Sequence, residues 1–327
     1  MPDAPCLPRR LAVRSPNWLG DAVMAMPALE ALRREREVEI SILCQPKLVG
    51  LWKLLPWVRE VIPIPGGILS TAMGLRKRHF EGILVLPNSL RTGLEAFLAG
   101  IPMRVGFEGH WRRHLLTHTR PRLTMAESHR HQALDYLELL FWREENLPAP
   151  QLPEVVKPGK PPITEPYFVI CPGAEYGPAK RWPAERFATV AMILWNEGLK
   201  PVILGARSDI PAGKEMERLL THRCVNLTGK TGFDEFLCHL AHARLLLCND
   251  SGAMHIASLL RTPAVAVFGS TEDTLTGPLH PCVRVVREKP ECSPCFLRVC
   301  PIDFRCMLEI DTPRVLAEAR AALQNSA

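Results

Sequence analysis

The first half of the chain alternates between short apolar runs and longer stretches with apolar residues spaced three or four apart. Continuous β-branched runs are typical of strands buried in a parallel sheet, and the wider spacing indicates helices. We therefore predict strands at residues 10–13, 38–44, 60–64 and 82–86, and helices at residues 21–36, 48–55, 69–77, 90–98 and 129–146.

A proline-rich stretch then interrupts this pattern. Residues 147–166 contain seven prolines and show no hydrophobic periodicity. Proline fixes φ and lacks a backbone donor, so this stretch suits neither a helix nor an inner strand. We interpret residues 151–166 as a linker between a domain of residues 1–150 and a domain of residues 167–327.

The second half resumes the same alternation. It predicts an α/β protein with two Rossmann-like domains, because strands that alternate with helices form parallel sheets with crossover helices. A cleft between such domains is a common ligand site. It is open whether the final helix packs back on the first domain. The expected strands are residues 167–171, 201–204, 245–248 and 264–268, and the expected helices are residues 184–197, 210–220, 251–260 and 312–324.

Composition narrows the class of protein. The 327 residues suit two domains of roughly 150 residues, and 47% hydrophobic with 23% charged residues is typical of a folded soluble protein. The net charge of +6 favours an anionic partner: a phosphorylated sugar, a lipid surface or nucleic acid. Aromatic residues are scarce and stand apart from the cations, which argues against nucleic acid. With no signal peptide or membrane-spanning run, we expect a cytoplasmic protein.

Four of the eleven cysteines gather at Cys292, Cys295, Cys300 and Cys306. Four thiolates bind Zn²⁺ tetrahedrally, and the first pair has a suitable spacing. The second pair is separated by five residues, which is irregular for a zinc ribbon. Zinc ligands and reduced packing thiols both stay open, and we assign no metal.

A first polar motif, NWLGDAV at residues 17–23, follows the first predicted strand. Gly20 permits a tight turn, and Asp21 falls at the start of the next helix. Asp21 suits either a helix N-cap or a general base at the carboxyl end of a strand, and its position favours neither.

A second motif, CPGAEYGPAKRWP at residues 171–183, also joins a strand to a helix. Backbone amides near Gly173 and Gly177 form a possible anion cradle, with Lys180 and Arg181 to neutralise the charge. The spacing is not that of a Walker A loop. A surface loop with two solvated cations is the alternative.

The third motif is Asn249-Asp250-Ser251-Gly252, which leads directly into a helix. A helix N-terminus attracts anions, Ser251 adds a hydroxyl donor, and Gly252 allows a phosphate to approach. Helix capping by Asp250 or Ser251 is the alternative. His255 lies one turn into the helix, where packing is more expected than catalysis.

Basic residues are concentrated in the first domain, at residues 76–79, 91, 112–114 and 120–122. Any one cluster is ordinarily solvated. Together they favour an anionic acceptor or membrane headgroups.

The three motifs, in this order, resemble those of the bacterial ADP-heptose:lipopolysaccharide heptosyltransferases, a glycosyltransferase family 9 group of GT-B fold. Further support comes from LPNSLR at residues 86–91, AGIPMRVG at residues 99–106 and CSPCF at residues 292–296. Gly173-Ala174 replaces the Thr-rich donor loop of the first-heptose enzymes, which favours the second-heptose type. The resemblance covers nearly the whole chain.

The resemblance implies an inverting, metal-independent transfer of heptose from ADP-heptose to the inner-core heptose on Kdo-lipid A, with no cofactor. Asp21 matches the proposed catalytic base and Lys180 the donor-phosphate lysine. Asp250, Ser251 and Gly252 match the segment that contacts the donor. Residues 205–209 are expected near the nucleoside. A related enzyme with another nucleotide-sugar or acceptor and a non-catalytic nucleotide-sugar binder are the alternatives.

We therefore expect a monomer that touches the cytoplasmic face of the inner membrane and binds no nucleic acid. Catalysis is assigned to Asp21 and Lys180. Expected donor contacts are Gly173, Ala174, Lys180, Arg181, Asn249, Asp250, Ser251, Gly252 and His255, and expected acceptor contacts are Asn17, Trp18, Asn88, Arg91 and Arg112.

Overall fold

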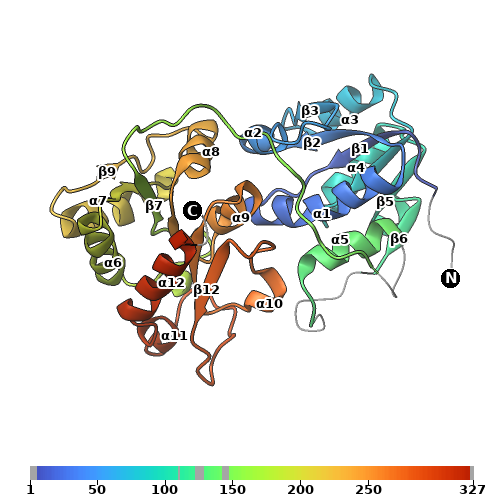
Figure 1. The fold of residues 1–327 in the computed structure, drawn as a ribbon. Helices are drawn as coiled ribbons and strands as arrows, with labels where there is room; N and C mark the ends of the chain where they lie inside the picture. The colour runs from blue at the N-terminus through green and yellow to red at the C-terminus, as the bar shows by residue number, and fades with distance from the viewer. Residues whose placement is uncertain (1–5, 110, 122–128, 142–146, 325–327) are drawn as a thin grey trace. The chain divides into compact units, whose positions relative to one another are not determined.

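The computed structural model describes residues 6–109, 111–121, 129–141 and 147–324 (Figure 1). The chain divides into two compact units, which we call unit 1 (Met1–Val156) and unit 2 (Lys157–Ala327). Each unit contains its own six-stranded parallel sheet. Among the described helices, none has both the length and the apolar character that a membrane span requires.

Unit 1 has the strand order β3-β2-β1-β4-β5-β6, and every neighbouring pair is parallel. Its strands are β1 Arg10–Arg14, β2 Glu39–Cys44, β3 Glu60–Pro63, β4 Gly82–Val85, β5 Met103–Phe107 and β6 His118–Arg120. Its helices are α1 Leu19–Glu35, α2 Val49–Trp52, α3 Ile68–Arg76, α4 Leu90–Leu98 and α5 Gln132–Phe141, with 3₁₀ turns at Pro46–Leu48 and Arg112–His114.

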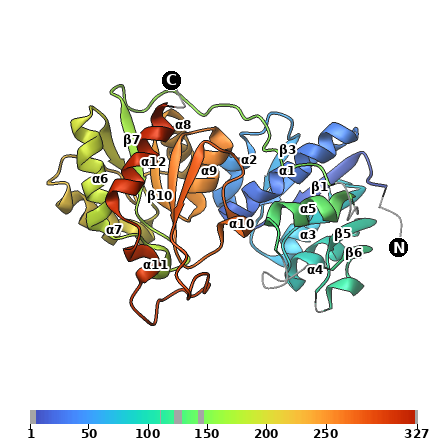
Figure 2. The same cartoon turned by 60° about the horizontal axis from the view of Figure 1, so that its bottom comes forward.

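The direction of each crossover decides which helices cover which face of this sheet. The connections from β1 through β2 to β3 move toward one edge of the sheet, and those from β3 through β4 to β5 move toward the other edge. Because parallel crossovers are right-handed, the reversal of direction places α3 and α4 on the face opposite α1. Accordingly α1 packs against α5, and α3 packs beside α4 (Figure 2). Ala72 and Leu75 of α3 and Ala96 of α4 point into the core of that layer.

Unit 2 repeats the strand order, with β7 in the place of β1 and β10 in the place of β4. Its strands are β7 Tyr167–Cys171, β8 Lys200–Ile203, β9 Val225–Asn226, β10 Leu246–Asn249, β11 Ala264–Phe268 and β12 Val283–Arg287. Its helices are α6 Ala184–Asn196, α7 Ile210–Leu219, α8 Phe233–His242, α9 Gly252–Leu260, α10 Asp273–Thr276, α11 Arg305–Leu308 and α12 Thr312–Gln324, with 3₁₀ turns at Pro178–Lys180 and Arg207–Asp209.

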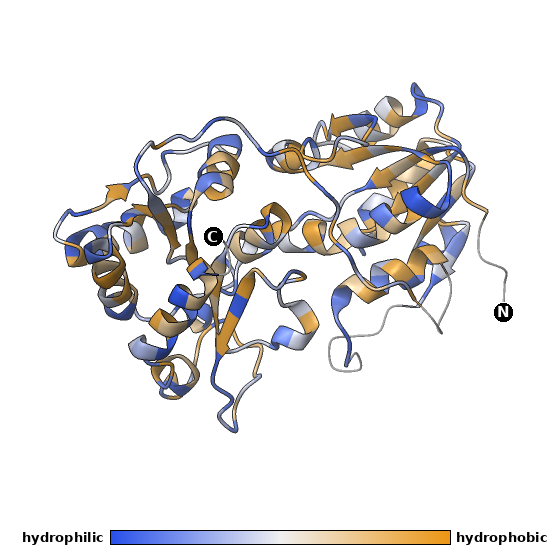
Figure 3. Cartoon of the chain, in the orientation of Figure 1, coloured by the Kyte–Doolittle hydropathy of each residue, from blue (hydrophilic) through white to orange (hydrophobic). Residues whose placement is uncertain are grey.

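The inner strands are apolar because helices cover both faces of each sheet. All residues of β7 and β11 are buried, and the strands are largely hydrophobic in Figure 3. The C-terminal α12 packs on α6, β11 and β12 and so belongs to the core of unit 2.

The predicted strands and most predicted helices are confirmed, with bounds that differ by a few residues. The helix predicted at residues 48–55 is a 3₁₀ turn followed by the four-residue α2. The helix predicted at residues 129–146 is α5, and residues 142–146 lie outside the described residues. The pattern missed β5, β6, β9, β12, α8 and the four-residue helices α10 and α11. Of these, β6, β9 and β12 are edge strands whose short or partly polar sequences resemble loops.

Candidate active site

Every predicted site motif follows one of the two central strands of its sheet. In unit 1, β1 pairs with β4, and in unit 2, β7 pairs with β10. The strand order reverses between these pairs, and open parallel sheets bind ligands at the carboxyl ends of strands at this reversal. Residues 17–21 thus come together with residues 88–91, and residues 172–181 with residues 249–252.

In unit 2 the centre of the site is an ion pair between Lys180 and Asp250. Lys180 Nζ lies 2.5 Å from Asp250 Oδ2, and both side chains are largely buried. The same carboxylate oxygen accepts a hydrogen bond from Thr271 Oγ1 at 2.5 Å. Lys180 Nζ also lies 4.7 Å from the ring centre of Tyr176. The ammonium group is therefore held in place before any ligand binds, as electrostatic stabilisation of a bound anion requires.

Asn249 joins the two loops of this site. Its side chain is 0% exposed. Its Oδ1 accepts from the Trp182 backbone N–H at 2.9 Å, and its Nδ2 donates to Pro172 O at 2.8 Å. Since the amide has partners at both ends, Asn249 positions the loop of residues 172–182.

We expect Asn249→Ala to lower the free energy of unfolding of unit 2 by about 2–4 kcal/mol, because one buried N–H and one buried carbonyl lose their partners. Urea unfolding followed by circular dichroism measures the change. Asn226→Ala, on the edge strand β9, is the matched control and should cost about 1 kcal/mol. Equal losses in the two variants would contradict the bridging role.

The N-terminus of α9 lies next to the ion pair. Ser251 occupies the N-cap position, and its hydroxyl makes no capping hydrogen bond. The carboxylate of Asp250 is used by Lys180 and Thr271. Neither Asp250 nor Ser251 therefore caps α9 through its side chain, and the capping alternative to anion binding is wrong. His255 lies within the buried part of α9.

Sequence reasoning missed the aromatic and polar residues that support Lys180. Tyr176 lies between Lys180 and Arg298, whose guanidinium carbon is 5.2 Å from the ring centre. Tyr176 OH donates to Phe296 O at 2.5 Å, and the Phe296 backbone N–H donates to Ser270 O at 2.8 Å. The cysteine-rich loop of residues 292–306 thus holds Tyr176 in place beside Lys180. No local pattern marks these contacts, because they join segments about a hundred residues apart.

Gly177 allows this loop to approach. Its φ is +155°, and a Cβ there would lie 2.4 Å from Arg298 O. Any larger residue would push the loop away from Tyr176.

The other donor candidates of the second motif face different surroundings. Gly173 packs against Asp209, because a Cβ on Gly173 would lie 2.1 Å from the carboxylate. Ala174 is buried beside it. Arg181 donates to Ala174 O at 3.5 Å and lines a cavity of about 450 Å³ together with Trp182. A carboxylate beside Gly173 disfavours a phosphate there, whereas Lys180 and α9 favour one.

In unit 1, Asp21 lies in the first turn of α1, and the N-cap residue is Trp18. The capping interpretation of Asp21 is therefore wrong. Its Oδ1 accepts a hydrogen bond from Gln132 Nε2 of α5 at 3.2 Å, and Gln132 also contacts Tyr136 OH at 3.3 Å. Gln132, which the sequence did not mark, orients the carboxylate.

A buried polar network lies beneath the first motif. Arg14 donates to Glu95 at 3.3 Å and to Asn17 Oδ1 at 3.3 Å, and Asn17 Oδ1 also accepts from Gln45. Glu95 in turn pairs with Arg91 at 3.0 Å. Burial lowers the pKa of Arg14, and the charge of Glu95 opposes that shift. Asn17 and Arg91 are thus connected through two buried charges.

Asn88 and Arg112 form a second pair at the carboxyl edge. Arg112 is 1% exposed, hydrogen-bonds Asn88 Oδ1 and donates to Val85 O at 3.4 Å. Burial lowers the pKa of its guanidinium to about 10. Arg112 is therefore a buried support for Asn88 rather than an exposed cation. Trp18 is exposed, with Lys47 Nζ 5.6 Å from its ring centre.

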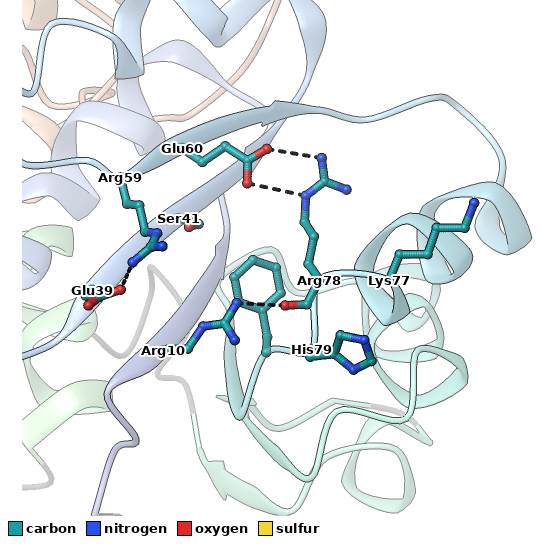
Figure 4. A pocket seen from close by; sticks show the side chains of 9 residues that line it. Arg10, Glu39, Ser41, Arg59, Glu60, Lys77, Arg78 and His79 are labelled. Carbon is teal, nitrogen blue, oxygen red and sulfur yellow. Dashed lines mark hydrogen bonds and ion pairs between the residues drawn. The ribbon is translucent and has the colours of Figure 1, made fainter.

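A pocket of about 330 Å³ lies at the opposite, amino edge of the sheet in unit 1 (Figure 4). It is lined by the first residues of β1, β2 and β3, including Glu39 and Glu60. Glu39 pairs with Arg59, and Glu60 pairs with Arg78. Because it lies at the edge of the sheet away from Asp21, we do not assign it to the active site.

All eleven cysteines are free thiols. Within the described ranges, no group of three or more His, Cys, Asp or Glu residues is arranged to hold a metal ion. Burial, together with the charges of the neighbouring Cys292, Cys295 and Cys300, raises the pKa of Cys306 to about 11.

Residues 68–304 match the family model described as glycosyltransferase family 9 (heptosyltransferase). The chain is 33% identical over 305 residues to lipopolysaccharide heptosyltransferase 2 of Escherichia coli (strain K12), covering 85% of this chain and 88% of that protein. It is also 33% identical over 307 residues to the protein of that name from Salmonella typhimurium, with the same coverages. The solved structure of E. coli ADP-heptose lps heptosyltransferase II has a TM-score of 0.82 at 30% identity and covers 97% of this chain and 100% of that one. The predicted α/β class and GT-B fold are confirmed.

Proposed function

The chain belongs to glycosyltransferase family 9, and on that premise we propose that it transfers heptose from ADP-heptose to the inner-core heptose of lipopolysaccharide. The observation that carries this proposal is the preorganised Lys180–Asp250–Thr271 cluster beside the N-terminus of α9. A nucleoside diphosphate is the anion that such a cluster fits. Relatives named lipopolysaccharide heptosyltransferase 2, matched over most of their length, support the choice of sugar and acceptor.

In the proposed reaction, an acceptor hydroxyl oxygen attacks the anomeric carbon of the donor heptose. Its proton passes to the carboxylate of Asp21, and the bond between the anomeric carbon and the ADP oxygen breaks. Lys180 and the free amides of α9 stabilise the charge that develops on the departing diphosphate. Gln132 keeps Asp21 in the orientation that the proton transfer requires.

The remaining assignments divide between the two units. In unit 2, Ser251 and Gly252 serve the diphosphate, and the carboxylate of Asp209 beside Gly173 suits the hydroxyls of the donor nucleoside. In unit 1, Asn17, Asn88 and Arg91 serve the acceptor at the carboxyl edge of the sheet. We propose that the protein works as a monomer at the cytoplasmic face of the inner membrane, where a lipid-linked acceptor is reached.

Mass spectrometry of the product tests this function. Incubation with ADP-heptose and a heptosyl-Kdo-lipid A acceptor should add the mass of one heptose and release ADP. An acceptor without the inner-core heptose should stay unmodified. Turnover of a different nucleotide-sugar but not of ADP-heptose would replace the proposed donor. Donor binding with no turnover of any acceptor would indicate a non-catalytic binder.

A further inference from the structure

The outer surfaces of α3 and α4 in unit 1 carry apolar side chains where a water-facing helix carries polar ones. Leu69 and Met73, one turn apart on α3, are 68% and 60% exposed. On α4, Leu90, Phe97 and Leu98 are also exposed. The two helices pack side by side on one face of the sheet, so these residues share a surface. Exposed apolar patches of this kind mark interaction sites.

This apolar surface is not a consequence of a poorly formed core. The inward side of the same helices is occupied by Thr71, Ala72, Leu75 and Ala96, which are buried against the sheet. Leu69 and Met73 therefore lie outside the core of unit 1, and docking on a partner would remove their contact with water.

The charges on this surface have one sign. Arg76 ends α3 and Lys77 follows it, and both are exposed. Arg91 lies in the first turn of α4 and is half exposed. Glu95, the single acidic residue of the two helices, is buried between Arg14 and Arg91. The outward residues of the two helices are therefore apolar or cationic, and the nearest carboxylates are Glu39 and Glu60 of the amino-edge pocket, which Lys77 also lines.

Another surface helix shows what the ordinary pattern is. The exposed side of α7 in unit 2 carries Lys214, Glu215 and Arg218, with charges of both signs. A helix face that is apolar and basic, with no acid, fits the headgroup region of an anionic bilayer, where apolar side chains enter the acyl boundary and cations meet lipid phosphates.

We propose that the α3/α4 surface, defined as Leu69, Met73, Arg76, Lys77, Leu90, Phe97 and Leu98, docks on an anionic lipid bilayer. This inference rests on the proposed function, because a lipid-linked acceptor brings unit 1 to the membrane. Arg91 lies at the junction of this surface with the carboxyl edge of the sheet that carries Asn88. Docking through α3 and α4 therefore places the acceptor sugars beside Asn88 while the lipid stays in the bilayer.

Sedimentation with vesicles tests the docking surface. The full chain should bind vesicles of equal parts phosphatidylglycerol and phosphatidylcholine more tightly than vesicles of phosphatidylcholine alone. Leu69→Gln/Met73→Gln should weaken binding at least about tenfold, because two exposed apolar side chains no longer enter the bilayer. Arg76→Gln/Lys77→Gln should weaken binding to the anionic vesicles about fivefold per cation and reduce its salt sensitivity.

The matched control is Val299→Gln/Ile302→Gln in unit 2, whose side chains are 66% and 62% exposed. This variant should bind vesicles as tightly as the unchanged chain does. All variants should have the melting temperature of the unchanged chain. The proposal is wrong if the full chain does not bind anionic vesicles, or if the unit 2 variant loses binding and the α3 variant does not. A concentration-dependent dimer that the α3 variant abolishes would instead identify the surface as a contact between copies.

A soluble, delipidated acceptor separates this proposal from the proposed function. The Leu69→Gln/Met73→Gln variant should glycosylate the soluble acceptor at the rate of the unchanged chain and a vesicle-embedded acceptor more slowly. Turnover of the soluble acceptor without vesicle binding would overturn the docking surface and leave the function standing. Vesicle binding without turnover of either acceptor would overturn the proposed function and leave the docking surface standing.

Discussion

Asp21→Asn should lower kcat by about a hundredfold to ten-thousandfold, the range expected for removal of a general base. The substitution keeps the size of the side chain and its position in the first turn of α1, and removes the group that accepts the acceptor's proton. Steady-state release of ADP measures the change. The dissociation constant for ADP should stay unchanged, because the donor residues belong to unit 2 and Asp21 belongs to unit 1.

Asp234→Asn is the matched control for this experiment. Asp234 also lies in the first turn of a helix, α8, and is exposed. If Asp21 did no more than interact with the helix dipole, both substitutions would cost about 0.3–1 kcal/mol of stability and neither would slow turnover. A kcat for Asp21→Asn within about tenfold of the unchanged chain would remove Asp21 from the role of base.

Lys180→Met should lower kcat/KM by about a hundredfold to a thousandfold, the usual cost of losing one group that stabilises developing negative charge. The structure adds a second effect. Without Lys180, the buried carboxylate of Asp250 keeps Thr271 as a partner but loses its counter-charge, and it then opposes the incoming diphosphate.

The double variant Lys180→Met/Asp250→Asn should therefore recover about tenfold of the loss seen in Lys180→Met, because it removes the unpaired charge. Kinetics with varied donor concentration measure both variants. Lys200→Met is the matched control, since Lys200 pairs with Glu165 at 2.6 Å in the same unit, away from β10. If the two losses simply add, Asp250 does not hold Lys180 for the donor.

Much of the architecture follows from local patterns in the chain. Continuous apolar runs such as residues 167–171 and 264–268 are strands because a sheet covered on both faces demands apolar residues on each side. Of the four edge strands, β3 was predicted, whereas β6, β9 and β12 were missed because they are short or partly polar. In β12 two arginines interrupt the valines, the partly exposed Arg284 and the buried Arg287, which pairs with Glu272 and Asp273, and β9 is two residues long. A short or half-polar strand differs little from a loop in sequence.

The residues of the candidate site also fall into those that the sequence identified and those that only the tertiary structure revealed. Its strand-to-helix motifs, with Asp21, Lys180 and Asp250, were evident from sequence because each is a short contiguous segment with a recognisable family resemblance. Tertiary structure alone decided that Asn249 and Arg112 are buried supports. It also revealed Gln132 behind Asp21, and Thr271 and Tyr176 around Lys180. These contacts depend on which strands become neighbours, since β7 lies beside β10 and α1 beside α5. A local pattern specifies what a segment becomes, and non-local pairing of strands and helices decides which segments meet.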